Sequence, residues 1–420
     1  MTPEDKSFLT DLFDAAVAAA DPARALAGHL PDPPKGRTVV IGAGKGAAQL
    51  ARAFETLWPS PLSGVIVTRY GYAAPCQHLR VIEAAHPVPD AAGQAATREV
   101  FAALEGLTED DLVVALITGG GSALLAAPPE GLTLADEQAL NESLLVSGAP
   151  IGAMNAIRKQ VSRVKGGRLA LAAAPARVVT LVVSDVPGDD PAEVASGPTV
   201  PGPATRDTAR AAIRAWNITL PESITRYLST AVEDAPAPDD PAFSRNEVHV
   251  IASAARSLEA AAALSAARGV PTHILSDSME GEARDIARAH AAIAREIARN
   301  NRPFQRPCLL LSGGETTVTL RQKGRGGRNS EFLLAFALAT EGVAGIAALA
   351  ADTDGIDGSE DNAGAFADGD TCAAIRAAGV DPAEALATND AWGAFDACDA
   401  LFVPGPTGTN VNDFRAILIR

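Results

Sequence analysis

A strand-like run that leads directly into three glycines and a serine constrains this chain more than any other stretch. Residues 112–117 are apolar and of strand length, and Gly119-Gly120-Gly121-Ser122 follow before a helical pattern begins at Ala123. The start of a helix offers unpaired backbone N–H groups and a partial positive charge, and glycine lets an anion approach them. The stretch therefore predicts a phosphate or carboxylate site, although a tight turn explains a single loop of this kind equally well.

Short runs of Val, Ile and Leu alternate with alanine-rich helical stretches along the whole chain. This alternation is typical of a sheet covered by helices, so the predicted fold class is α/β. A chain of 420 residues is long enough for two domains. A stretch rich in Pro, Asp and Ala over residues 232–245 is interpreted as a linker, which puts the domains at residues 1–240 and 241–420. Alternation over residues 316–320 predicts an antiparallel neighbour, and hence a mixed sheet, in the second domain.

Composition excludes several classes of protein. The formal net charge is −16, so the chain as a whole would repel nucleic acid. No run approaches the ~20 uninterrupted apolar residues of a membrane span, and the first residues lack the basic start of an export signal, so a cytoplasmic location is expected. The four cysteines are scattered without a C-x-x-C pair, which argues against a disulfide framework and a thiolate metal site.

The first strand, over residues 37–41, leads into Gly42-Ala43-Gly44-Lys45-Gly46-Ala47, which has the G-x-G-x-x-A spacing of dinucleotide sites. The next strand ends in Arg69 and lacks the acid that binds the ribose of NAD, although an NADP site could use Arg69. A Walker loop does not fit, because Gly46 follows Lys45 where Ser or Thr is required. Lys45 is therefore predicted to act as a point charge on a phosphate or carboxylate.

Three further stretches of the first half carry polar residues. His86 lies in a proline-containing loop and is interpreted as a hydrogen-bonded structural residue. The cations of residues 158–168 are interpreted mainly as an exposed basic helix face, with anion binding as an alternative for Lys165 beside two glycines. Asp185 and Asp189 follow a strand over residues 178–183, so they are candidates to hold Mg²⁺ or to take a proton, with Asx turns as the competing explanation.

The second half repeats the pattern of a glycine loop before a helix. Gly324-Arg325-Gly326-Gly327-Arg328-Asn329 opens an apolar helix, and Arg328 is predicted to bind an anion together with the N–H groups of the helix start. Asp352 and Asp354 end a strand and could bind Mg²⁺ directly or through water. The polar run 405–413 is typical of loops that line ligand clefts.

Taken together, these motifs resemble the MOFRL-type (class II) glycerate kinase family over nearly the whole chain. The resemblance rests on Gly42-Ala43-Gly44-Lys45, Gly119-Gly120-Gly121-Ser122-Ala123, Asn155-Ala156-Ile157-Arg158-Lys159 with Lys165-Gly166-Gly167, Ser184-Asp185-Val186-Pro187-Gly188-Asp189 with Ser196-Gly197-Pro198-Thr199, Gly326-Gly327-Arg328-Asn329, Asp352-Thr353-Asp354-Gly355 and Thr407-Gly408-Thr409-Asn410. It implies transfer of the ATP γ-phosphoryl group to glycerate, typically at the 2-hydroxyl, with a divalent metal such as Mg²⁺. It also implies a Rossmann-like three-layer N-terminal domain with a mainly parallel sheet, a smaller C-terminal α/β domain with a mixed sheet, and an active cleft between them.

The resemblance assigns roles to individual residues. Lys45 and Arg328 match the lysine and arginine of the family's cleft, whereas Arg325 occupies a position that is often lysine. As a hypothesis, Asp189 would orient or deprotonate the attacking hydroxyl, and Mg²⁺ would be held by Asp185 or by the pair of acids at 352 and 354. The remaining residues expected to contact substrate or phosphate are Gly44, Gly119, Gly120, Gly121, Ser122, Lys165, Ser196, Gly197, Glu315, Arg325, Asn329 and Asn410.

Two other functions stay open at this point. Members of the family have often carried the name hydroxypyruvate reductase, which suits the G-x-G-x-x-A spacing and makes an NAD(P)H-dependent reductase the alternative. A non-catalytic metabolite-binding protein is the third hypothesis. The expected partners are glycerate and a nucleotide, with no nucleic acid and no membrane, and a homodimer is kept as an open option.

Overall fold

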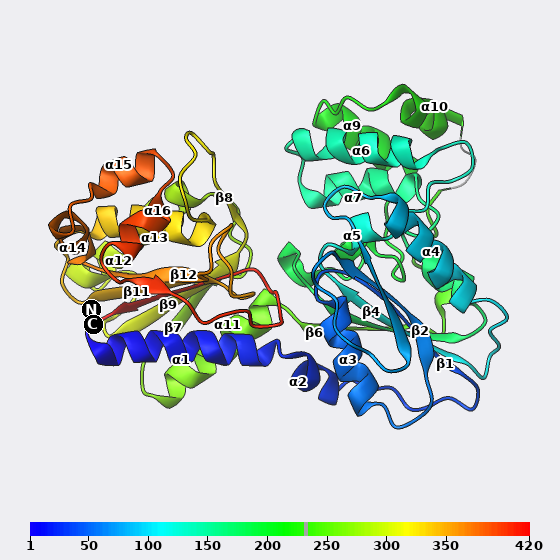
Figure 1. Ribbon diagram of the computed structural model, residues 1–420, viewed down its shortest axis with the longest axis horizontal. Helices are drawn as coiled ribbons and strands as arrows, with labels where there is room; N and C mark the ends of the chain where they lie inside the picture. Colours follow the sequence, from blue (N-terminus) through cyan, green and yellow to red (C-terminus); the bar gives the residue numbers. More distant parts are fainter. Residues whose placement is uncertain (231–233) are drawn as a thin grey trace. The chain divides into compact units, whose positions relative to one another are not determined.

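The chain divides into two compact units, which are described one at a time (Figure 1). The computed structural model describes residues 1–230 and 234–420. The central unit comprises Pro22–Ile251, and the terminal unit comprises Met1–Asp21 together with Ala252–Arg420. Within the described residues, none of the helices combines the length and the apolar character that crossing a membrane requires.

The central unit is built on a six-stranded sheet in the order β3-β2-β1-β4-β5-β6. All the pairings from β3 through β5 are parallel, as the fold-class prediction required. The strand order reverses between β1 and β4, and open α/β sheets bind ligands outside the carboxyl ends of their strands at such a switch point. The strands are β1 (Thr38–Ala43), β2 (Ser63–Arg69), β3 (Leu79–Ala84), β4 (Leu112–Thr118), β5 (Arg177–Val183) and β6 (Glu247–Ala252).

Helices cover both faces of this sheet because its Val- and Ile-rich strands are apolar on both sides. One face packs against α4, α5 and α8, and the other against α3. A separate group of four helices, α6, α7, α9 and α10, has its own apolar core around Leu144 and Ile157, and this layer was not predicted. The helices are α2 (Pro22–Ala27), α3 (Ala47–Leu57), α4 (Ala91–Ala103), α5 (Gly121–Leu124), α6 (Leu134–Val146), α7 (Ile151–Gln160), α8 (Arg168–Ala173), α9 (Arg206–Ala215) and α10 (Glu222–Thr230), with 3-10 turns at Pro187–Asp189, Val194–Ser196 and Pro241–Phe243.

The terminal unit contains a mixed six-stranded sheet in the order β13-β12-β11-β14-β9-β7. Its mixed character, which was predicted, comes from the parallel pairing of β7 with β9, since the other pairings, including those of β14 with β11 and β9, are antiparallel. The predicted source was wrong: in the 316–320 stretch only β10 (Thr316–Thr317) is a strand, and it pairs in parallel with β8 (Gly281–Glu282) in a separate ribbon. The strands of the large sheet are β7 (Thr272–Ser276), β9 (Cys308–Gly314), β11 (Ile346–Asp352), β12 (Gly364–Asp368), β13 (Leu401–Phe402) and β14 (Asp413–Ile419).

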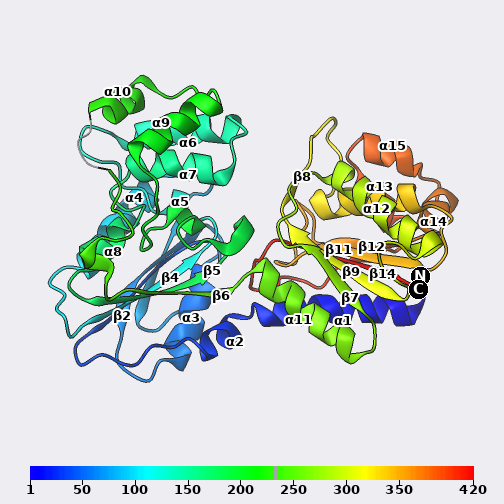
Figure 2. The same ribbon diagram turned by 180° about the vertical axis from the view of Figure 1, so that it is seen from behind.

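Helices also cover both faces of the mixed sheet, as Figure 2 shows from behind. The first helix of the chain, α1, lies with α11 on one face, and α12 and α13 lie on the other. The helices are α1 (Pro3–Ala19), α11 (Ala254–Ala267), α12 (Ala283–Asn300), α13 (Arg328–Thr340), α14 (Thr371–Ala377), α15 (Pro382–Ala387) and α16 (Ala391–Asp396).

The structure shifts both ends of the expected first domain, which was placed at residues 1–240. Helix α1 belongs to the terminal unit, where the ring of Phe13 lies 5.0 Å from that of Phe402, because an apolar helix face packs where an apolar sheet face is available. Strand β6, expected to open the second domain, instead completes the central sheet.

The predicted linker, residues 232–245, also needs correction. Its residues 232 and 233 lie outside the described residues. From Ala235 onward the segment contacts the central unit: the amide of Ala235 donates to Gln160 Oε1 at 3.1 Å, and Arg245 donates to the carbonyl oxygens of Pro175 and Glu109. These bonds make it part of the central unit rather than a tether between domains.

His290 makes the stability of the terminal unit depend on pH. Its Nδ1 donates to the Ile286 carbonyl at 2.8 Å, its Nε2 lies 3.0 Å from Ser312 Oγ, and burial, which outweighs the bond to Ile286, lowers the pKa of His290 from 6.5 to about 4. Between these two values the unfolded state binds more protons, so the unfolding free energy falls as the pH drops from 6.5 to 4. We expect His290→Gln to reduce this fall by about 1–3 kcal/mol. Urea unfolding of the wild type and of His290→Gln at pH 7 and pH 4.5 measures this difference. An equal fall in the unfolding free energy of the two proteins would contradict the prediction.

Candidate functional site

Two turns meet at the switch point of the central sheet. Lys45 follows β1, and its amide donates to the carbonyl of Gly119 at 2.8 Å, while the amide of Gly46 donates to Thr118 Oγ1 at 3.1 Å. Gly44 has φ 139°, and a Cβ there would lie 2.1 Å from Thr118 Oγ1, so only glycine fits. The turn that carries Lys45 is therefore locked against the glycine turn, Gly119–Ser122.

The glycine turn brings three polar side chains together. A Cβ on Gly119 would lie 1.7 Å from Asp185 Oδ2, and a Cβ on Gly120 would lie 3.1 Å from both Lys45 Cγ and His86 Nε2. Lys45 is half-buried and has no ion-pair partner among the residues that the structure describes. A lysine without a counter-ion, held at the carboxyl ends of parallel strands, is suited to an anionic ligand.

Replacing Gly119 with alanine tests how tightly this turn is packed. We expect Gly119→Ala to lower the unfolding free energy by about 1 kcal/mol, because the new methyl group must displace the Asp185 carboxylate, which can move. The matched control is Gly152→Ala in α7, where a Cβ meets nothing within 4 Å and alanine favours the helix. Urea denaturation that gave equal stability for the two variants would contradict the predicted crowding.

His86 was interpreted as a hydrogen-bonded structural residue, and that interpretation was wrong. Among the described residues, its ring nitrogens have no hydrogen-bond partner. Burial, with smaller contributions from Lys45 and Arg69, lowers the pKa of His86 to about 4, so the ring is neutral at pH 7. A neutral imidazole beside the glycine turn can accept a proton or a hydrogen bond from a ligand. No sequence pattern indicates this, since the position of His86 beside Gly120 depends on how the loop after β3 folds.

The acids after β5 hold different positions. Asp185 is half-buried against Gly119, and Asp189 is half-buried with φ 55°, a left-handed backbone conformation that costs energy for residues other than glycine. Asp189 has no side-chain partner within the described part of the chain. The structure thus joins Asp185 to the group around Lys45 and leaves the carboxylate of Asp189 available.

Ser196 and Gly197 lie beneath the glycine turn. Ser196 Oγ is 2.8 Å from Ser122 Oγ and donates to Asn155 Oδ1 at 2.8 Å, and the side chain is 1% exposed. The Gly197 carbonyl accepts from Gly167 N at 2.7 Å. Of these two residues, both predicted to contact substrate, Ser196 supports the glycine turn from inside, and Gly197 bonds to the backbone of Gly167.

Most of the predicted basic helix face is not exposed. Lys165 Nζ donates to Glu137 Oε1 at 2.9 Å and to the Leu125 carbonyl at 3.0 Å, so an internal carboxylate takes the place of the predicted anion. Lys159 is 1% exposed and pairs with Glu193 at 2.6 Å. Lys159 and Lys165 are buried because acids on other segments, which a helical pattern does not reveal, neutralise them, whereas Arg163 is exposed as predicted.

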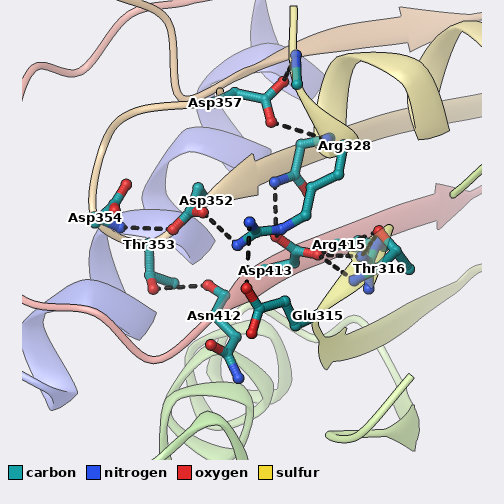
Figure 3. A network of polar contacts seen from close by, with 12 residues as sticks. Glu315, Thr316, Arg328, Asp352, Thr353, Asp354, Asp357, Asn412, Asp413 and Arg415 are labelled. Carbon is teal, nitrogen blue, oxygen red and sulfur yellow. Dashed lines mark hydrogen bonds and ion pairs between the residues drawn. The ribbon is translucent and has the colours of Figure 1, made fainter. Parts of the chain in front are cut away.

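In the terminal unit, Arg328 is the centre of a buried ionic cluster (Figure 3). Its Nε donates to Asp413 Oδ1 and its Nη2 to Asp352 Oδ2, both at 2.6 Å, while Nη1 lies 3.5 Å from Glu315 Oε1. Burial alone would lower the pKa of Arg328, but the surrounding acids raise it above its usual value. The cluster fixes the guanidinium and leaves Nη1 as its most loosely held end.

The register of the mixed sheet explains why these acids meet. Asp413 at the start of β14 is opposite both Asp352 on β11 and Gly314 on β9, next to Glu315. Like charges directly opposite each other destabilise a sheet, so the arginine between Asp352 and Asp413 is what makes the pairing tolerable. Asp413 was missed as a site residue because it was assigned to the polar run 405–413, whereas it is the first residue of β14.

The start of α13 does not bind an external anion as predicted. Asp357 accepts from the amides of Asn329 at 2.9 Å and Ser330 at 2.8 Å, and also from Gly327 N at 3.2 Å. Asn329 itself is fully buried and donates to Asp413 Oδ1 at 2.8 Å. An internal carboxylate therefore occupies the helix start, and Arg328 is left without the N–H groups expected beside it.

The acids at the end of β11 differ in availability. Asp352 accepts from Arg328 and, through Oδ1, from Asp354 N at 3.1 Å, and burial raises its pKa well above the usual value although Arg328 opposes this. Asp354 is half-buried and uses one oxygen to accept from Ile356 N at 2.9 Å. Within residues 1–230 and 234–420, no group of three or more His, Cys, Asp or Glu side chains is arranged around a metal site. Asp352 is thus a partner of Arg328, and Asp354 is the acid with an available oxygen.

Two predicted residues lie apart from these contacts. The guanidinium of Arg325 stacks on Trp392, 4.0 Å from the ring centre, and its Nε is 3.8 Å from Asp390. Asn410 Oδ1 accepts from Asn412 N at 3.0 Å, which stabilises its own loop.

Comparison with known proteins relates these features to a family. Residues 8–229 match a domain of unknown function (DUF4147), and residues 308–413 match the MOFRL family. A protein of Agrobacterium vitis with the provisional name hydroxypyruvate reductase is 50% identical over 99% of this chain and 94% of its own length. D-glycerate 2-kinase of Thermotoga maritima is 38% identical over 99% of this chain and 98% of its own. The crystal structure of glycerate kinase from Thermotoga maritima has a TM-score of 0.89 at 37% identity, and the match covers 99% of both chains.

Proposed function

Because the chain belongs to the MOFRL-type glycerate kinase family, we propose that it transfers the γ-phosphoryl group of ATP to the 2-hydroxyl of glycerate, giving 2-phosphoglycerate and ADP. The observation that carries the proposal is Lys45, a lysine without a carboxylate partner among the described residues, set against the glycine turn. Catalysis of phosphoryl transfer depends mainly on positioning the reactants and neutralising their charge, and the Lys45 ammonium group supplies the positive charge.

The residues around the glycine turn have different proposed roles. Lys45 holds the oxygens of the transferring phosphoryl group as a point charge. Asp189, whose carboxylate is available, orients or deprotonates the attacking hydroxyl. Asp185 lies beside Gly119, at the start of the glycine turn. The neutral ring of His86 can accept a hydrogen bond from that hydroxyl without adding a charge.

Arg328 contributes from the terminal unit. We propose, as the family resemblance implies, that Nη1 of Arg328 exchanges its loose contact with Glu315 for a phosphoryl oxygen. Asp352 and Asp413 hold the rest of the guanidinium, so only this end needs to move. A cytoplasmic location is part of the same proposal, since ATP is the phosphoryl donor.

Mg²⁺ fits this site only as an ion shared with the nucleotide. Mg²⁺ is usually bound by one or two carboxylates together with substrate phosphates and water, and it would there neutralise the phosphate oxygens. Asp185 of the central unit or Asp354 of the terminal unit would hold it, because Asp352 is already engaged by Arg328.

A hydroxypyruvate reductase is the second candidate, and the strand order of the central sheet favours it, since the order 3-2-1-4-5-6 is that of dinucleotide-binding folds. Against it, Arg69 stacks on Tyr72 at 4.9 Å instead of standing ready for an NADP phosphate. One coupled assay separates the two: ATP with glycerate should yield ADP, while NADPH with hydroxypyruvate should leave the nicotinamide absorbance unchanged. The reverse outcome would replace the kinase proposal by the reductase.

A further inference from the structure

A narrow pocket of the central unit lies beside the glycine turn, between helices α6 and α7. It is lined by Ser122, Glu137, Leu140, Asn141, Arg158, Val161 and Lys165. The first of these residues ends the glycine turn itself, so the pocket and the turn share Ser122.

Arg158 forms no ion pair with any described residue, although Glu137 lines the same pocket. Its Nη1 and Nη2 donate to Asn155 Oδ1 at 3.2 Å and to Asn141 Oδ1 at 2.9 Å, and both acceptors are neutral. Its Nε is shielded from solvent, and no partner for it exists among the described residues. Burial lowers the pKa of Arg158 to about 10, with only Glu137 opposing this shift. A charge removed from water without a partner is costly, so the site is built for an anion.

Glu137 does not supply that anion. Its Oε1 is bonded to Lys165, while its Oε2 is buried and has no hydrogen-bond partner within the part of the chain that the structure describes. The pocket therefore presents an unpartnered donor, Arg158 Nε, and an unpartnered acceptor, Glu137 Oε2. A ligand with a carboxylate and a nearby hydroxyl group satisfies both.

A chain of hydrogen bonds fixes Arg158 relative to the glycine turn. Asn155 Nδ2 donates to Glu193 Oε2 at 2.8 Å, which turns Oδ1 of the same amide toward Arg158 and Ser196. Ser196 Oγ in turn lies 2.8 Å from Ser122 Oγ. On the other side, Asn141 Nδ2 donates to the Pro87 carbonyl at 2.9 Å, next to His86. Hydrogen bonds thus connect the guanidinium through Asn155 to the glycine turn and through Asn141 to the loop that carries His86.

We propose that Arg158 and Asn141 form the subsite that binds the carboxylate of the acceptor, a small hydroxy acid, while Glu137 accepts a hydrogen bond from one of its hydroxyl groups. This inference rests on the proposed function, and it assigns the substrate carboxylate to Arg158, which leaves Lys45 for the phosphoryl group. Arginine suits this role because its planar fork binds both oxygens of a carboxylate.

The test compares glycerate with its neutral amide, glyceramide, as acceptors for the wild type and Arg158→Met. Loss of a hydrogen-bonded charge should lower kcat/KM for glycerate about 10- to 100-fold, mainly through KM, and should leave kcat/KM for glyceramide within about threefold. KM for ATP should stay within about twofold of the wild-type value. Arg98→Met, which changes an exposed arginine of α4, is the control and should match the wild type with both acceptors.

Two outcomes would overturn the subsite. An equal loss with both acceptors would show that Arg158 acts through folding alone, and a rise in KM for ATP would assign the pocket to a nucleotide phosphate. Calorimetry with glycerate alone separates this inference from the kinase proposal. If the wild type binds glycerate but shows no kinase turnover, and Arg158→Met abolishes the binding, the subsite stands and the proposed function is wrong. If the wild type shows kinase turnover and Arg158→Met binds glycerate as the wild type does, the proposed function stands and the subsite is wrong.

Discussion

Replacing Arg328 with lysine should lower kcat/KM for glycerate on the order of 10²-fold or more while the protein remains folded. Lysine keeps the charge that Asp352 and Asp413 require, but its single ammonium group cannot contact both of them and also reach a phosphoryl oxygen. A contact made mainly in the transition state should appear as a fall in kcat with little change in KM. Steady-state kinetics with ATP and glycerate, together with the thermal midpoint, measure both effects.

The control for this experiment is an arginine of the same unit that carries only a surface pair. Arg376→Lys alters the exposed contact of α14 with Glu341 and should retain kcat within about twofold. Wild-type kcat/KM in Arg328→Lys would mean that the guanidinium serves the packing of the sheet alone, and the assignment of Nη1 to a phosphoryl oxygen would be wrong.

Asp413→Asn should destabilise the protein by about 3–5 kcal/mol. Asp413 is the only carboxylate paired with Arg415 among the described residues, and the Arg415 side chain is completely buried. An amide of the same shape leaves this buried charge without compensation, and it also weakens the bonds to Arg328 and Asn329. A loss of that size is a large share of the ~5–15 kcal/mol that usually separates folded from unfolded states.

Urea unfolding followed by circular dichroism measures this loss. Asp285→Asn provides the comparison, because Asp285 forms a surface pair with Arg288 and its removal should cost less than about 1 kcal/mol. If Asp413→Asn unfolded at the same urea concentration as Asp285→Asn, the charge of Asp413 would not be needed to hold Arg415.

The sequence predicted well those features that depend on neighbours along the chain. The run 112–117 followed by glycines is indeed a strand that enters a turn and a short helix, and Lys45 follows the neighbouring strand. Parallel strands place their carboxyl ends at one edge, so the proximity of Lys45 to the glycine turn follows once β1 and β4 are adjacent. The α/β class follows from the same local patterns.

Features set by strand register or by distant charges could not be predicted. Arg328 was recognised as important, but its partner Asp413 is fixed by the pairing of β14 with β11 and β9. Lys165 was predicted to bind an anion, but Glu137 of helix α6, which is distant in sequence, neutralises it. Asp357 occupies the start of α13 for the same reason: a cap supplied from another loop leaves no periodic signal in the helix it stabilises.

The terminal unit draws its first helix from one end of the chain and its sheet from the other, with the whole central unit between them. During synthesis, residues 22–251 leave the ribosome well before β14 does, so the central unit can fold while α1 still lacks its binding surface. Until β14 has been synthesised, the apolar side of α1, with Phe8, Leu12 and Phe13, lacks the sheet face on which it packs in the folded unit.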